Sequence, residues 1–110
     1  MSYRDGKLSS GRWFNLTLIE QMANIGSEVI RAISWKKKRD EEYSRIAFER
    51  ALELLDLTIA DPRHRHRLKE ICRAREVLCD YFIGDNEYKS TNEQWEKYFY
   101  TFNLAARKDY

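Results

Sequence analysis

Turn-forming residues are scarce in this chain, and that scarcity limits what it can fold into. Its 110 residues include one proline, Pro62, and only four glycines. A sandwich or barrel of short strands needs a turn about every 8 to 12 residues, and such turns rely on glycine and proline. A chain of this length forms a single domain most often. One core built from long helices is therefore expected.

Apolar residues recur at helical spacing in four segments separated by polar stretches. The expected helices span about residues 15–35, 41–60, 62–83 and 92–108. Because short connections favour antiparallel neighbours, the predicted fold is an all-α, up-and-down antiparallel four-helix bundle. Residues 12–110 make up this single domain. Residues 1–11 are polar and lack periodicity, and they are predicted to be a flexible N-terminal arm.

Residues that commonly cap helices mark the expected starts. Asn15 is the predicted N-cap of the first helix, and Asp40 is that of the second. Asp61 and Pro62 begin the third, because proline suits the first helical position. Gly84 is expected to end it. Two capping boxes are possible before the fourth helix: Ser90 with Glu93, and Thr91 with Gln94.

Both cysteines are expected to be free thiols in the core. Cys72 and Cys79 lie about two helical turns apart, beyond the reach of a disulfide. The predicted inward stripe of the third helix contains both of them: Leu68, Cys72, Arg75, Cys79 and Phe82. Free thiols and no recognisable signal peptide predict a reducing cytoplasm. No apolar run approaches the roughly 20 residues that cross a bilayer, so no membrane contact is expected.

Positive charge is concentrated in one part of a nearly neutral chain. The formal net charge is only +2, but residues 61–75 carry six Lys or Arg against two Asp or Glu. With a second basic run, these residues are a possible polyanion site: Lys36, Lys37, Lys38, Arg39, Arg63, Arg65, Arg67 and Lys69. The alternative is that the cations are solvated or paired within the protein. In a bundle the two runs lie at opposite ends.

No catalytic, cofactor or metal motif stands out in the sequence. His64 and His66 face different ways on a helix, and the cysteines lack the CxxC spacing of zinc modules. Both histidines are expected at the surface. No Glu-x-x-His pair, glycine-rich phosphate loop or nucleophile elbow is present. The sequence therefore predicts a protein that is not an enzyme and holds no metal or cofactor.

The first helix contains an unusual polar stretch around Gly26. A glycine in a helix interior costs about 1 kcal/mol relative to alanine, so close approach of a second helix, or else a kink, is expected there. Asn24 and Glu28 lie one turn apart on either side of it. We expect them to form a buried polar network with Arg75, because a buried charge requires a partner.

Aromatic residues outside the main stripes predict an interface. Trp35 and Tyr100 are these residues. With the broad apolar faces of the second and fourth helices, they favour a non-enzymatic helical-bundle protein that self-associates and acts as an interaction scaffold. The alternative is an accessory protein that binds a polyanion or RNA through residues 63–75.

Four segments resemble a small family of uncharacterised prokaryotic proteins. They are residues 11–16 (GRWFNL), 24–29 (NIGSEV), 48–56 (FERALELLD) and 73–81 (RAREVLCDY). The helix pattern is also similar to that of four-helix proteins encoded in ribosomal-RNA intervening sequences and of accessory variability proteins of retroelements. That resemblance implies ring-like oligomers and, for the retroelement proteins, a basic surface for nucleic acid and a reverse transcriptase.

Overall fold

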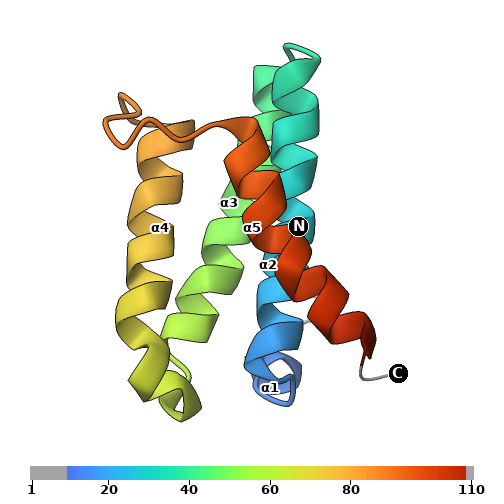
Figure 1. Cartoon of the computed structure of the whole chain (residues 1–110), viewed down its shortest axis with the longest axis vertical. Helices are drawn as coiled ribbons and strands as arrows, with labels where there is room; N and C mark the ends of the chain where they lie inside the picture. Colours follow the sequence, from blue (N-terminus) through green and yellow to red (C-terminus); the bar gives the residue numbers. More distant parts are fainter. Residues whose placement is uncertain (1–9, 109–110) are drawn as a thin grey trace.

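The computed structural model describes residues 10–108, which are helical apart from short connections (Figure 1). The helices are α1 (Ser10–Trp13), α2 (Leu18–Lys37), α3 (Glu41–Ile59), the 3-10 helix η2 (Pro62–Arg67), α4 (Leu68–Phe82) and α5 (Asn92–Lys108). Most of the predicted flexible arm, residues 1–9, lies outside the described part, as do residues 109–110. Residues 10 and 11 of that predicted arm belong to α1.

The long helices do not all contact one another equally. α2 packs closely against both α3 and α5, and α3 packs against α4, but α4 and α5 make few contacts. Figure 1 shows α5 crossing in front of α2, with α4 set apart on the far side of α3. The edge between α4 and α5 is therefore the loosest part of the helical assembly.

The core lies mainly between α2, α3 and α5. The apolar residues of α2 that recur at helical spacing are buried, including Met22, Ile25, Val29 and Ile33. The other large core side chains come from several elements: Trp13, Phe48, Leu54, Leu55, Ile71, Leu78, Trp95 and Phe99. Burial of each such side chain contributes about 1.5–3 kcal/mol of hydrophobic free energy.

Close helix approach explains Gly26, as the sequence predicted. A Cβ atom at this position would lie 2.7 Å from the Cβ of Phe99 and 2.9 Å from its Cδ1. No side chain fits at that separation, so glycine allows α5 to pack directly on the backbone of α2.

The predicted N-cap of the first long helix was wrong. α2 begins after Thr17, not Asn15, because Thr17 and Glu20 form a complete capping box. The Glu20 N–H donates to Thr17 Oγ1 at 3.1 Å, and the Thr17 N–H donates to Glu20 Oε1 at 2.9 Å. Asn15 lies instead in the turn that follows α1, where its N–H donates to the carbonyl of Arg12.

The third predicted helix is divided in two. Asp61 and Pro62 do begin it, since the Asp61 side chain accepts the N–H of Arg63. However, residues 62–67 form the 3-10 helix η2, and His64 has non-helical angles, φ −103° and ψ 21°. The α-helix starts only at Leu68. This irregular turn directs the His64 ring into the protein.

The buried stripe of α4 also differs from the prediction. Ile71, Ala74 and Leu78 face the core, whereas Cys72 is exposed and Leu68 is 37% exposed. The predicted stripe would have placed the charge of Arg75 at its centre, which is costly without a buried partner. In the observed orientation Arg75 lies at the margin and its Nε donates to Asp56 of α3 at 2.8 Å.

The fourth helix was predicted over residues 92–108, and α5 has these bounds. Of the two capping boxes, Thr91 with Gln94 is the one that forms, with hydrogen bonds of 3.0 and 3.1 Å. Gly84 follows the end of α4, but without a positive φ. It is needed there for space, because a Cβ would lie 3.0 Å from the Cα of Asp80.

Candidate functional site

The two basic runs lie at opposite ends of the molecule. Residues 36–39 form the end of α2 and its turn into α3, and residues 63–69 form η2 and the start of α4 (Figure 1). They do not merge into one surface in a single chain. A polyanion would therefore contact one run at a time.

Three of the four cations in the run at the end of α2 make contacts within the protein. The Nζ of Lys36 lies 3.8 Å from the centre of the Tyr81 ring, a cation–π contact with α4. Lys37 pairs with Glu96 of α5 at 3.2 Å. Lys38 lies over the ring of Trp35, and Arg39 has a positive φ in the turn. Through Lys36 and Lys37, the run joins the end of α2 to α4 and α5.

The second run is only partly engaged. Arg63 forms hydrogen bonds with Asp61 and donates to the carbonyl of Leu16 at 2.7 Å, and Arg67 pairs with Glu70. Arg65 and Lys69 are exposed, and within residues 10–108 the structure shows no carboxylate partner for either. These two cations are the part of the second run that stays available to a ligand.

The predicted polar network does not join the three residues proposed for it. Glu28 is buried, as expected, but it pairs with Arg31 of its own helix at 2.9 Å. Asn24 donates to the carbonyl of Glu20 at 2.8 Å. Arg75 pairs with Asp56, as described above. α4 packs on α3, so Arg75 finds its acid on this adjacent helix.

A different buried polar cluster lies where α1, α2, α3 and η2 meet. Gln21 is fully buried, and its Nε2 donates to the carbonyl of Trp13 at 2.9 Å. Its Oε1 lies 2.8 Å from His64 Nε2, which also lies 3.3 Å from Asp61 Oδ2. Because both neighbours are acceptors, Nε2 carries the proton. The Trp13 indole N–H donates to Thr58 at 3.0 Å. This cluster attaches the irregular segments to the core.

Sequence reasoning missed this cluster and wrongly placed His64 at the surface. One signal was present: Gln21 occupies a position adjacent to Met22 on the inward stripe of α2, and a polar residue there needs a partner. The partner was not recognisable, because a continuous helix from Pro62 would have turned His64 outward. His66 is exposed, as predicted.

Protonation of His64 is expected to destabilise the fold. Burial lowers the pKa of this imidazole below its ordinary 6.5, against the opposing effect of Asp61. Its neutral form is therefore favoured by folding, and stability should fall as the pH drops below 6.5 towards the folded-state pKa. Urea unfolding between about pH 7 and pH 5 measures this loss. His64→Gln should flatten the profile, and the matched exposed variant His66→Gln should retain it. Equal profiles for both variants would contradict this assignment.

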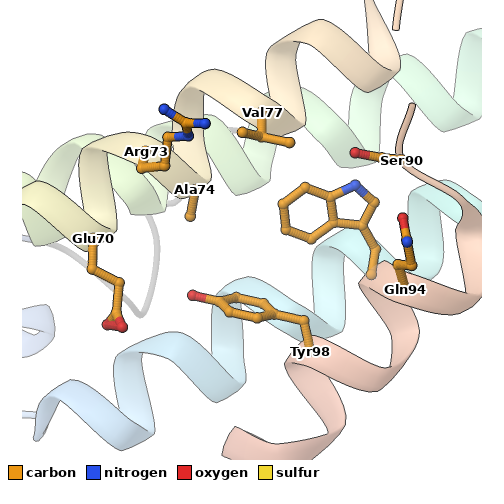
Figure 2. Close-up of a pocket in the computed structure, with 8 residues that line it drawn as sticks. Glu70, Arg73, Ala74, Val77, Ser90, Gln94 and Tyr98 are labelled. Carbon is orange, nitrogen blue, oxygen red and sulfur yellow. The ribbon is translucent and has the colours of Figure 1, made fainter. Parts of the chain in front are cut away.

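A groove lies at the open edge between α4 and α5, with a cavity volume of about 320 Å³. The residues that line it are Glu70, Arg73, Ala74, Val77, Ser90, Gln94, Trp95 and Tyr98. Figure 2 shows Ala74 directed from α4 into the groove and the Tyr98 ring opposite it, while the Arg73 guanidinium points away to the rim. The groove is thus apolar inside, with polar groups at its ends and edges.

Some polar groups in the groove have hydrogen-bond or charge partners, and others do not. Trp95 is buried, yet its indole N–H has no acceptor among the described residues. Such a buried donor costs about 1–3 kcal/mol. Burial also raises the pKa of the Tyr98 hydroxyl above its ordinary 10.0. Glu70 is neutralised by Arg67, and Arg73 lies 4.8 Å from the centre of the Tyr88 ring.

The two predicted interface residues lie on different helices. Trp35 is half-buried in the last turn of α2, where its ring lies 4.9 Å from that of Tyr43. Tyr100 lies in the middle of α5 and is 59% exposed. Leu104, one turn further along α5, is 44% exposed. Tyr100 and Leu104 form what we call the outer strip of α5.

Residues 10–108 contain no group of three or more His, Cys, Asp or Glu side chains arranged to hold a metal ion. Cys72 and Cys79 are free thiols, as predicted, and burial raises the pKa of Cys79. No helix in the described part of the chain is long and apolar enough to span a membrane. No protein family, curated protein or solved structure matches this chain.

Proposed function

We propose that this chain is a non-enzymatic interaction protein that self-associates and serves as a scaffold. The observation that carries the proposal is the apolar surface of α5. Phe99 and Trp95 face the core and account for the packing of α5 on the rest of the protein. Tyr100 and Leu104 lie on a different side of the helix and add apolar area that this packing does not use.

The outer strip of α5 is suited to a second copy of the chain. Its two side chains lie one turn apart, so they face the same neighbour. Burying apolar area stabilises association by about 25 cal/mol per Å². Identical chains usually pair through the same surface on each copy, which would place the outer strips together. Trp35 extends this proposal to the end of α2.

The proposal also covers the helix topology, the cellular compartment and the relatives of the chain. The four long helices are an up-and-down four-helix bundle that is open between α4 and α5. The protein works in a reducing cytoplasm, which the two free thiols support. Its suggested kinship with the uncharacterised prokaryotic family, and with the intervening-sequence and retroelement proteins, remains a prediction.

Light scattering behind a sizing column tests self-association. We expect a defined oligomer for the wild-type chain and a monomer for Tyr100→Glu with Leu104→Glu, because two charges would have to be buried in the interface. Thr101→Glu is the control, since it adds a charge at an exposed position of the same helix. A wild-type protein that remains monomeric as its concentration rises would rule out the proposal.

A polyanion-binding function is the second candidate, and the exposed cations Arg65 and Lys69 favour it. Binding through these residues should weaken steeply with salt, because phosphate contacts release counterions. Fluorescence anisotropy of labelled RNA at low and moderate salt measures this. Arg65→Gln with Lys69→Gln should lower the salt dependence by about two counterions. Affinity that does not change with salt would exclude this function.

A further inference from the structure

α5 is attached to the rest of the protein through α2 rather than through α4, the helix that precedes it in the chain (Figure 1). Phe99 of α5 packs directly on the backbone of α2 at Gly26. Lys37 of α2 pairs with Glu96 of α5 at 3.2 Å. α4 and α5 make few contacts with each other. The inner face of α5 would therefore pack equally well on the α2 of another copy.

The connection from α4 to α5 is anchored to α4 for most of its length. The Asp80 carboxylate accepts the N–H groups of Glu87 and Tyr88 at 2.8 and 3.0 Å. The Tyr88 hydroxyl donates to Glu76, also on α4. The connection up to Tyr88 thus belongs structurally to α4, and residues 89–91 form the hinge between this unit and α5.

Lys89, at the start of this hinge, has a strained backbone. Its φ is 55°, in the left-handed region that glycine adopts without cost and lysine does not. Its side chain is exposed, so core packing does not impose this conformation. The turn is closed by hydrogen bonds between Asn86 and residues 89–90, at positions near the surface where water can replace them. Extending the hinge would relieve the strain at Lys89.

We propose that two copies of the chain exchange α5, so that each α5 packs on the α2 of the other copy. Such a dimer keeps the contacts that the inner face of α5 makes with α2, since Phe99 and Glu96 meet the same residues of the second copy. Exchange of an identical element is a low-cost route to a dimer, and the hinge loop governs it. This inference rests on the self-association proposed above and names how the copies join. The outer strip of α5 stays exposed in the exchanged dimer and can still pair.

Cross-linking of Lys37 to Glu96 tests the exchange. A water-soluble carbodiimide joins an amine and a carboxylate in direct contact as an amide, and it takes up the water that this releases. Lys37 precedes the hinge and Glu96 follows it, so the amide links two chains when α5 is exchanged. Chains labelled with ¹⁴N and with ¹⁵N are unfolded in urea and refolded together, and a sizing column isolates the dimer. We expect about half of its cross-linked peptides to contain both isotopes, because the chains pair at random.

Two substitutions of Lys89 should shift the monomer–dimer equilibrium in opposite directions. Lys89→Gly removes the strain from the monomer, so the association constant should fall about tenfold or more, because the dimer contains two hinges. Lys89→Pro cannot adopt a φ of 55°, so it should favour the dimer. Asp85→Gly is the control, because Asp85 lies in the same connection without a positive φ. It should leave the association constant unchanged.

The outcomes separate exchange from self-association. A wild-type dimer whose cross-linked peptides each contain a single isotope overturns the exchange and leaves pairing through the outer strip in place. A chain that stays monomeric at every concentration overturns both proposals. Equal association constants for Lys89→Gly and Lys89→Pro also contradict the exchange. The monomer fraction is the control for the cross-linking reaction, since its amide forms within one chain.

Discussion

Gly26→Val is expected to lower the free energy of unfolding by about 3 kcal/mol. Even the first added carbon would lie 2.7 Å from the Cβ of Phe99, and valine places two more methyl groups beyond it. Overpacking of this kind usually costs about 1–3 kcal/mol. The better helix propensity of valine offsets only a few tenths. The steric cost is the larger effect, because Phe99 is buried and cannot turn towards solvent, so the substitution lowers the free energy of unfolding.

Urea denaturation measures this effect, and Gly11→Val is the control. Gly11 also lies in a helix, but an added Cβ there meets no atom within 4 Å. Its substitution should change stability by less than about 0.5 kcal/mol. In the double variant Gly26→Val with Phe99→Leu, the loss should be smaller than the sum of the single losses, because the two residues share one contact. Equal effects at both glycines would refute close packing of α5 on α2.

Asp61→Ala is expected to lower the free energy of unfolding by about 3 kcal/mol. This carboxylate is buried and has three roles: it caps η2, pairs with Arg63 at 2.6 Å, and accepts hydrogen bonds from the cluster around Gln21. Removing this carboxylate leaves Arg63 with only the Leu16 carbonyl as acceptor, and His64 with only Gln21 Oε1. Asp40→Ala is the matched control. Asp40 caps α3 through one exposed hydrogen bond to Tyr43, so its loss should cost about 1 kcal/mol.

The pH dependence of folding stability gives an independent check on the role of Asp61. The hydrogen bonds from Arg63 hold the pKa of the Asp61 carboxyl at about 2, below its ordinary 3.8. Its contribution is therefore complete above pH 3.8 and is lost as the pH falls from there towards 2. The shift corresponds to about 2 kcal/mol. Asp61→Ala should lack this acid-dependent loss, and Asp40→Ala should keep it. If Asp40→Ala destabilises as much as Asp61→Ala, the cluster is not what holds η2.

The candidate surfaces were harder to predict than the helices. Tyr100 was recognisable because it lies outside the apolar stripe of its own helix. The basic runs were recognisable too, but the sequence does not show which cations have partners: Lys36 lies over Tyr81, whereas Lys69 has no carboxylate partner within residues 10–108. The groove was not predicted, because it depends on how far α4 and α5 stand apart. Trp95 and Tyr98 line it for the same reason.

Local sequence by itself determined where most of the helices lie. Periodic apolar residues, the Asp40 cap and the Thr91 capping box act within a few residues of the chain, so they could be read directly. The need for glycine at position 26 was also predictable from the cost of a helical glycine. Tertiary structure decided the rest. The rotation of α4, the inward turn of His64 and the open α4–α5 edge depend on contacts between residues far apart in the chain, where burial, charge pairing and packing compete.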